Sequence, residues 1–283
     1  MKGCIRQGEL GFPKILAQRA PDVKCLYYMG NPTLLETCCI AVVGSRKCTQ
    51  YGKTVARAIG KKLGQNGITL VSGLARGIDA QGHQGVLDAD GKTIAVLAGG
   101  PDHVYPRQNR QLYEQIEKTG LLLSEHPFGY VAKPYDFPLR NRIISGISES
   151  VVVVEAGSSS GALITAEYGI DQGKRVYAVP GNITSYYSAG TNRMIREKAE
   201  PLIYIDDLLL DLDKIPNIIE ETLALGEDER RVYEEIKKAG EITIDDLHHK
   251  TNMNLSEING MITILEMKGI IFSALGKISV AKF

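Results

Sequence analysis

The feature that most constrains the fold is a recurrence of short, continuous apolar runs, each ended by glycine, proline or small polar residues. Six such runs stand at residues 40–43, 68–71, 93–97, 121–123, 151–154 and 175–179. Because their apolar residues are continuous rather than alternating, we expect strands that are covered on both faces. The intervals have the length of helices, and residues 51–63 place Val55, Ile59 and Leu63 on one stripe. This alternation predicts an α/β fold with a doubly wound parallel sheet.

The last part of the chain has a different pattern. Helical segments are predicted at residues 227–238, 243–250 and 255–268, and short strands at residues 270–272 and 277–280. Three helices followed by a hairpin indicate a small C-terminal winged-helix domain. A chain of 283 residues is long enough for two domains. We therefore divide it into a lead-in segment, a sheet domain, a linker and the winged-helix domain, at residues 1–35, 36–216, 217–226 and 227–283.

Composition is that of an ordinary soluble globular protein, with 43% hydrophobic and 23% charged residues. No apolar run approaches the roughly 18 residues that a membrane helix needs, so we expect no membrane insertion. The N-terminal residues lack the apolar core of a signal peptide, which predicts a cytoplasmic location. The five cysteines are odd in number and never spaced as CxxC, so we expect free thiols rather than disulfides or a zinc site.

The net charge of zero conceals two parts of opposite sign. Residues 1–216 carry 25 Lys and Arg against 21 Asp and Glu, whereas residues 217–283 carry 8 against 12. The two parts therefore have net charges of +4 and −4. So mild an excess does not decide a function by itself, and the placement of the cations matters more than their number.

Glycine, small hydroxyl and arginine residues gather next to the predicted strands. They stand in the segments 44–46, 72–79, 99–107, 137–142 and 158–161. An open parallel sheet binds ligands beyond the carboxyl ends of its strands, where glycines let backbone amides approach an anion. Arginine adds bidentate phosphate contacts. The glycines alone are also explained by tight turns, but arginines in several equivalent loops favour a phosphate-binding groove.

The motifs of nucleotide enzymes are incomplete. Residues 44–52 do not form GxGxxG, and the second strand ends without the acidic residue that holds a ribose. Two GKT sequences lack the first glycine of a P-loop. We therefore expect no cofactor and no metal. Glu155 and Glu167 are a candidate carboxylate pair for acid–base chemistry, although Glu167 is better explained as a residue on a helix face.

Several motifs together identify a family. They are Val43-Gly44-Ser45-Arg46 with Tyr51-Gly52, Ser72 to Asp79 (SGLARGID), Tyr105-Pro106, Phe137 to Gly146 (FPLRNRIISG), Ser160 to Ala166 (SGALITA), and Val179-Pro180-Gly181 with Gly190-Thr191-Asn192. On these residues the chain resembles the bacterial DNA-processing protein DprA family, also called Smf, over about residues 25–210. The resemblance implies an extended Rossmann-like domain that binds single-stranded DNA, forms a homodimer and loads RecA during natural transformation, without catalysis. Many members also have a helical N-terminal domain of the sterile-alpha-motif type, which we expect this chain to lack.

The resemblance also implies a set of DNA-binding residues. They are Gly44, Ser45, Arg46, Gly73, Arg76, Lys133, Phe137, Arg140, Asn141, Arg142, Ser160 and Gly161. The first loop, with Arg46, is expected to hold a phosphate, and Arg140 and Arg142 to lie beside the DNA. Phe137 is expected either to stack on a base, which is worth about 1–3 kcal/mol, or to anchor the core. Lys133 stands where a basic residue supports the groove.

Two alternatives remain open. The related cytokinin-activating phosphoribohydrolases are enzymes, and their PGGxGTxxE motif would fall at residues 155–165, where the double glycine after proline is absent. A nucleoside-monophosphate phosphoribohydrolase is therefore the second candidate function. In the predicted winged helix, the recognition helix carries Glu257 and Glu266 against Lys268. This acidic balance favours a protein-contact or regulatory role over duplex binding.

Overall fold

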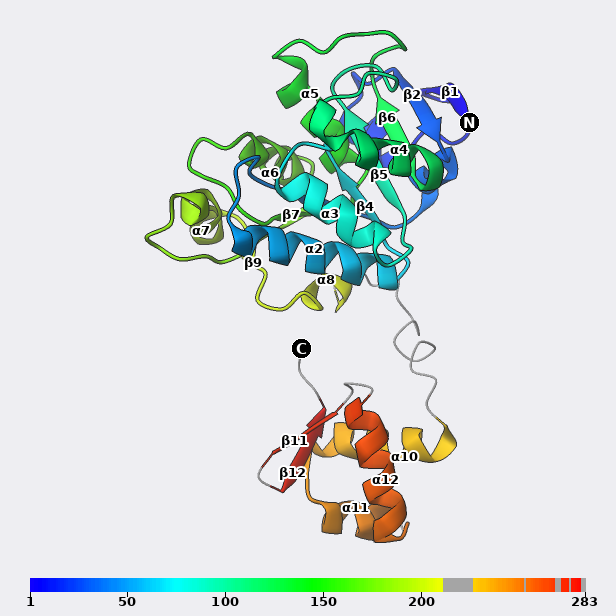
Figure 1. Ribbon diagram of the computed structural model, residues 1–283, viewed down its shortest axis with the longest axis vertical. Coiled ribbons are helices and arrows are strands. Elements are labelled where there is room, and N and C mark those ends of the chain that lie inside the picture. The colour runs from blue at the N-terminus through cyan, green and yellow to red at the C-terminus, as the bar shows by residue number, and fades with distance from the viewer. Residues whose placement is uncertain (211–225, 252, 268–270, 275, 281–283) are drawn as a thin grey trace. The chain divides into compact units, whose positions relative to one another are not determined.

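The computed structural model describes residues 1–210, 226–251, 253–267, 271–274 and 276–280 (Figure 1). The chain divides into two compact units, which we call the first unit, Met1–Ile205, and the second unit, Asp206–Phe283. Of the predicted linker at residues 217–226, all but Gly226 lies outside the described residues.

The first unit contains a nine-stranded sheet in the order β1-β2-β6-β5-β4-β3-β7-β8-β9. Seven neighbouring strands are parallel, namely β3 (Cys39–Val43), β4 (Thr69–Ser72), β5 (Thr93–Leu97), β6 (Leu121–Ser124), β7 (Ser150–Val153), β8 (Arg175–Ala178) and β9 (Glu200–Pro201). The prediction of a doubly wound parallel sheet is therefore confirmed. The strand order reverses between β3 and β7, where Val43 lies opposite Val153. The loops after these two strands therefore start level with each other at the switch point, where such folds bind ligands.

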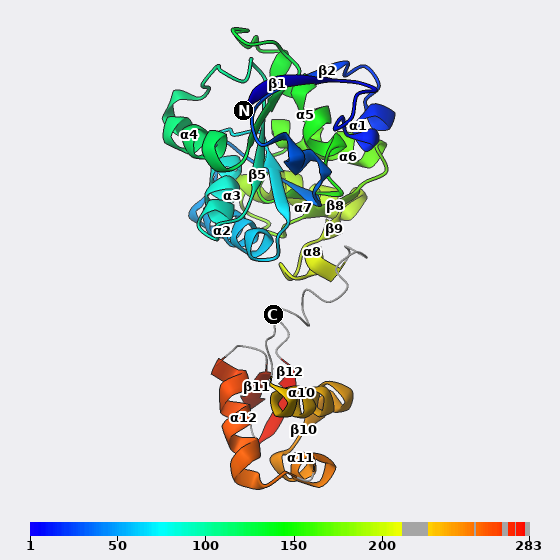
Figure 2. The same ribbon diagram turned by 90° about the vertical axis from the view of Figure 1, so that its right-hand side faces the viewer.

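Helices cover both faces of this sheet (Figure 2). One face is covered by α2 (Gln50–Gln65), α3 (Ile78–Leu87) and α4 (Arg110–Thr119), and the other by α1 (Lys14–Arg19), α5 (Asp136–Gly146) and α6 (Gly161–Asp171). The helix α7 (Ala189–Glu197) and the short 3-10 helices η2 (Arg107–Asn109) and η3 (Tyr186–Ser188) complete the unit. In the stripe predicted on α2, Ile59 and Leu63 are fully buried and Val55 is half-buried. The strands are buried on both sides, which explains their continuous apolar sequences.

The lead-in segment forms part of the sheet. It contains β1 (Lys2–Arg6), β2 (Cys25–Gly30) and the 3-10 helix η1 (Pro32–Glu36). Strand β1 pairs antiparallel with β2, and β2 pairs antiparallel with β6. These two strands extend the sheet beyond the parallel strands that the sequence predicted.

The second unit contains the three predicted helices and the hairpin. After α8 (Asp207–Leu210) come α10 (Glu227–Ala239), β10 (Glu241–Ile242), α11 (Ile244–Thr251), α12 (Leu255–Met267), β11 (Ile271–Ala274) and β12 (Lys277–Val280). The short strand β10 was not predicted, and it joins the hairpin in the order β10-β12-β11. The helices and the sheet share a core that includes Val232, Leu247, Ile258 and Ile278. We keep the winged helix as our interpretation of this arrangement.

Membrane-spanning helices are not found in the described part of the chain: none of its helices combines the length and hydropathy that a span requires.

A fully buried histidine, His83, lies in α3. The Thr93 hydroxyl donates to the carbonyl of Leu70 at 2.8 Å, so it accepts from Nδ1–H of His83 at 2.6 Å. The other ring nitrogen, Nε2, has no hydrogen-bond partner among the described residues. Burial, together with the nearby charge of Arg140, lowers the pKa of His83 to about 3. The histidine is therefore neutral in the folded protein.

We predict that His83 makes the folded protein sensitive to acid. The unfolded chain binds a proton at a pKa near 6.5, whereas the folded chain does so only near 3. Between these values the unfolded state binds more protons, so the free energy of unfolding falls as pH falls, by up to about 1.4 kcal/mol per pH unit from this group. In His83→Asn, urea unfolding between pH 6 and 4 is expected to show a correspondingly flatter pH dependence. An unchanged slope would show that His83 is not the responsible group, even if the variant is less stable at every pH.

Candidate nucleic-acid interface

A groove opens at the carboxyl edge of the sheet. Its walls are the loops after β3, β4, β5, β7 and β8 and the first turns of α5 and α6, and its volume is about 950 Å³. A smaller pocket of about 40 Å³ adjoins it beside the loop after β5. The two share Arg46, Ala75, Arg76, Tyr105, Phe137 and Arg140. The two adjoining cavities together form what we call the groove.

The loop after β3 is held by the end of β7. The Ser45 amide donates to the carbonyl of Glu155 at 2.7 Å, and the Ser45 hydroxyl donates to the carbonyl of Lys47 at 2.6 Å. A Cβ atom on Gly44 would lie 2.5 Å from the Ile78 side chain. Gly44 and Ser45 therefore line the groove but serve first to shape the loop, and the Ser45 amide is already bonded. Arg46, the third predicted residue of this loop, lines both cavities.

The loop after β4 is folded around a buried carboxylate. Asp79 accepts from the amides of Gly73 and Ala75 at 3.2 and 3.3 Å. Burial raises the pKa of Asp79, while the Arg140 charge and these two amides oppose the rise. Gly77 has a φ of +79°, and a Cβ atom there would lie 2.3 Å from the carbonyl oxygen of Ser45. Only glycine lets the two loops approach this closely, and that contact brings Arg76 to the wall occupied by Arg46.

Arg140 forms the floor of the groove. Its guanidinium donates to the carbonyl of Gly73 at 2.9 Å and to the carbonyl of Val96. A Cβ atom on Gly73 would lie 2.5 Å from this guanidinium, so the position requires glycine. Burial lowers the pKa of Arg140 to about 10, opposed by the neighbouring Asp79, and the group stays charged at neutral pH. Arg140 therefore contributes a fixed positive charge.

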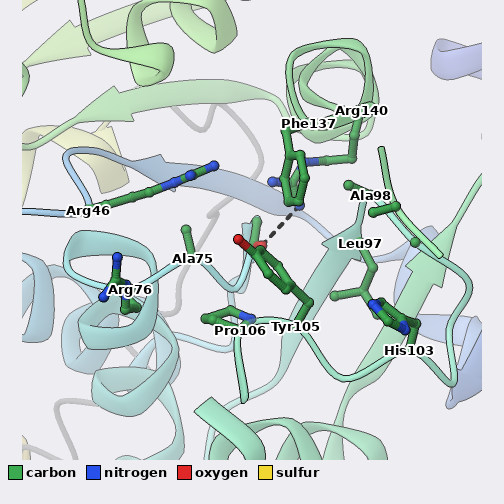
Figure 3. Close-up of a pocket in the computed structure, with 13 residues that line it drawn as sticks. Arg46, Ala75, Arg76, Leu97, Ala98, His103, Tyr105, Pro106, Phe137 and Arg140 are labelled. Carbon is green, nitrogen blue, oxygen red and sulfur yellow. Dashed lines mark hydrogen bonds between the residues drawn. The ribbon is translucent and has the colours of Figure 1, made fainter. Parts of the chain in front are cut away.

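Phe137 faces the groove rather than the core. Its ring is half-buried and lies 5.2 Å from the ring of Tyr105, measured between centroids. The guanidinium carbon of Arg46 lies 5.4 Å from the centroid of the Phe137 ring. Figure 3 shows Arg46 extending toward this ring, with Tyr105 beneath it. Because Tyr105 is 48% exposed, the three side chains present an aromatic and cationic surface to a ligand.

The other predicted residues fall into two groups. Asn141 donates to the carbonyl of Gly161 at 3.2 Å, and Ser160 caps the N-terminus of α6. Asn141, Ser160 and Gly161 all line the groove. Lys133 is exposed outside both cavities, with its ammonium nitrogen 5.8 Å from the centroid of the Tyr135 ring.

Arg142 differs from the other predicted residues, because it does not line the groove. Its side chain is only 7% exposed and donates to Asp22 at 2.9 Å and to both carboxylate oxygens of Glu125 at 2.8 and 2.9 Å. These bonds connect α5 with the lead-in segment and with the loop after β6. Arg142 has a structural role here, and we leave it out of the proposed DNA-binding surface.

Sequence reasoning also missed residues that line the groove. They are Lys47, Tyr105, Tyr186 and Tyr187. Tyr105 stands in the Tyr105-Pro106 motif, and the two later tyrosines follow the strand β8. Their place in the sequence, after a predicted strand, could have identified them, since every loop after a parallel strand reaches this same edge.

The groove is electropositive. Its charged lining residues in the described part of the chain are Arg46, Lys47, Arg76 and Arg140 against Asp79. Asp79 is compensated by the amides that it accepts from and by Arg140. The site is therefore suited to an anion.

The candidate carboxylate pair is not assembled for catalysis. Glu155 is buried and accepts from the amide and the hydroxyl of Thr49 at 2.8 and 2.5 Å, at the N-terminus of α2. Glu167 is exposed on α6. The five cysteines are free thiols, and the described residues contain no cluster of three metal-ligating side chains.

Known proteins are similar to this chain in sequence and in fold. A family model described as DNA recombination-mediator protein A matches residues 4–213. The chain belongs to this family. It is 43% identical to the DNA processing protein DprA of Bacillus subtilis over 188 residues, which are 66% of this chain and 63% of that protein. Identity to DprA of Streptococcus pneumoniae is 40% over 188 residues, or 66% of each chain. The chain spans about half to two thirds of the length of the curated relatives that it matches.

Solved structures of the family agree with the fold. DNA processing protein A from Streptococcus pneumoniae superposes with a TM-score of 0.71 at 37% identity, over 74% of each chain. DNA processing protein A from Helicobacter pylori superposes with a TM-score of 0.67 at 26% identity, over 74% of this chain and 94% of that one. The latter structure concerns that protein's mode of binding single-stranded DNA.

We predict that Arg142→Met destabilises the protein. The substitution removes charge-assisted hydrogen bonds and leaves the half-buried Glu125 unpaired, so the free energy of unfolding should fall by about 1–3 kcal/mol. Arg57→Met is the matched control, because Arg57 pairs with Asp88 at an exposed site where an ion pair contributes about 0–1 kcal/mol. Denaturant unfolding measures both. Equal small losses would contradict the structural role of Arg142.

Proposed function

We propose that the groove binds single-stranded DNA without sequence specificity, and that the protein acts through binding rather than catalysis. The observation that carries the proposal is the cationic groove, which is lined by the half-buried Phe137 ring beside Arg46 and Tyr105. Cations neutralise the sugar-phosphate backbone, and aromatic rings stack on bases whatever their sequence. The Helicobacter pylori relative, studied for its single-stranded DNA binding, supports the same ligand.

A single strand fits this surface better than a duplex does. A base stacks on a side-chain ring only when its own face is free, and the bases of a duplex are stacked on one another.

The second candidate, a nucleoside-monophosphate phosphoribohydrolase, needs a carboxylate that is free to act on the substrate. Glu155 does not meet this need, because both of its oxygens are bonded to Thr49.

We further propose that the protein is a homodimer that protects incoming DNA and loads RecA onto it during natural transformation. Membership of the DNA recombination-mediator protein A family supports this role. RecA acts in the cytoplasm, so we place the activity there. Residues 217–283, which make up most of the second unit and have a net charge of −4, are proposed to contact protein rather than duplex DNA.

We predict that Arg46→Ala weakens single-strand binding at least tenfold. Arg46 is the cation directly beside Phe137, and a hydrogen bond to a charged group is worth roughly 1.5–3 kcal/mol. Fluorescence anisotropy with a labelled oligo(dT) measures the change. The wild-type protein should prefer this probe to a duplex of the same length, and its binding should weaken with salt at a slope of about −0.7 per phosphate neutralised.

Arg230→Ala and Arg231→Ala are the controls for Arg46. Both arginines are exposed on α10, whose sequence around them is rich in acidic residues. Their positive charge is locally cancelled, so either substitution should change affinity little. Equal losses from all three substitutions, with unchanged circular dichroism, would contradict the placement of the DNA site. Tighter binding to duplex would contradict the proposed ligand.

We predict a dimer that accelerates RecA filament growth on DNA. Sedimentation at micromolar concentration should give about twice the chain mass of 30.9 kDa. RecA assembly on oligonucleotides already coated with a single-strand binding protein should be faster when this protein is added, and less so with Arg46→Ala. A monomer that leaves RecA assembly unchanged would refute this part of the proposal.

A further inference from the structure

Two adjacent tyrosines line the groove on the turn after β8, whereas Phe137 stands in the first turn of α5. Tyr186 and Tyr187 belong to η3, which follows β8, and both line the larger cavity. Their ring centroids are 5.6 Å apart and the ring planes meet at 83°, an edge-to-face arrangement. Tyr186 is 65% exposed, although it lies on an ordered turn.

This turn is held in place by backbone and hydroxyl contacts. The Ser185 hydroxyl accepts from the Tyr187 amide at 3.3 Å, and the Ser185 amide donates to the carbonyl of Asn182 at 3.0 Å. The Tyr186 ring rests against Gly157, where a Cβ atom would lie 2.7 Å from the ring. Gly157 belongs to the loop after β7, which also carries Ser160 of the groove. The ring is thus positioned before any ligand arrives, which lowers the entropic cost of stacking on it.

The strand order gives an estimate of the distance between the aromatic pair of Phe137 and Tyr105 and the pair of Tyr186 and Tyr187. Tyr105 follows β5 and Tyr186 follows β8, and the strand order β5-β4-β3-β7-β8 places four spacings between them. At about 4.8 Å per spacing the separation is roughly 19 Å, or about five to six nucleotides at a stacked rise of about 3.4 Å. Arg46, Lys47 and Arg76 come from the intervening loops. The order along the edge is therefore aromatic, cationic, aromatic.

We propose that Tyr186 is a second base-stacking site for the strand that stacks on Phe137, with the Tyr187 ring supporting it. The inference rests on the proposed function and extends it, because it gives the groove two base sites joined by a phosphate-binding stretch. Cationic walls between two rings that line the groove match the repeat of a single strand, in which bases and charged phosphates lie side by side. A free nucleotide has only one base and cannot use both sites.

A length series of oligo(dT), from two to ten nucleotides, tests the proposal by fluorescence anisotropy. Wild-type affinity should rise in a step once the oligonucleotide spans both sites. Tyr186→Leu should remove this step, with an affinity loss on the order of 5- to 150-fold for the longer probes and little change for the shortest. Tyr186→Phe, which keeps the ring, should retain the step. Phe137→Leu should weaken binding at every length.

Tyr204→Leu is the matched control, since Tyr204 is 52% exposed and is not part of the groove lining. Equal affinity of Tyr186→Leu and wild type at all lengths would overturn the second site and leave the proposed function intact. A uniform loss that includes the shortest probes would also overturn it, because probes too short to span both sites are expected to bind at Phe137. Absence of single-strand binding by the wild-type protein would instead refute the proposed function itself.

Discussion

The groove depends on the burial of one guanidinium, that of Arg140. It bonds to the carbonyl of Gly73, just beyond β4, and to that of Val96 in β5, with Asp79 nearby. A buried charge is tolerated only when it is paired and its donors are satisfied. These contacts fasten α5 across the ends of two strands. Phe137, one turn earlier on the same helix, is thereby fixed at the rim of the groove.

The four arginines predicted to bind DNA divide into two kinds by the state of their donors. In Arg140 and Arg142 the donors are used by carbonyls and carboxylates of the protein, so these residues hold α5 in place. Arg46 and Arg76 stand on loops at the groove wall. A phosphate needs a cation with free donors, so the loop arginines are suited to bind it while the helix arginines position the surface around it.

The groove lies where nucleotide enzymes of related topology bind their ligands, but its groups are arranged differently. A nucleotide enzyme concentrates its polar groups in one pocket at the switch point. Here the polar and aromatic groups extend along the edge from the loop after β5 to the turn after β8. Glu155, which follows β7 at the switch point, accepts hydrogen bonds from the amide and the hydroxyl of Thr49 at the N-terminus of α2. An extended strand of nucleic acid fits such a surface better than one small molecule does.

The parallel sheet and the edge at which the groove opens could be predicted from the sequence alone. Continuous apolar runs specify strands buried on both faces, and parallel strands bring the loops that follow them to one edge, so Arg46, Arg76 and Ser160 were placed correctly beside the groove. Sequence reasoning missed β1 and β2, because short strands at an antiparallel edge have one exposed face and a weaker apolar pattern.

Only the tertiary structure separated Arg140 from Arg142 and revealed Tyr186. Residues two apart on a helix point about 200° away from each other, so the two arginines of one motif face opposite sides of α5, one toward the groove and one toward Asp22 and Glu125. Tyr186 joins the groove because its turn packs on Gly157 from a distant loop. Such contacts depend on how segments far apart in the chain pack together, which no local pattern of residues encodes.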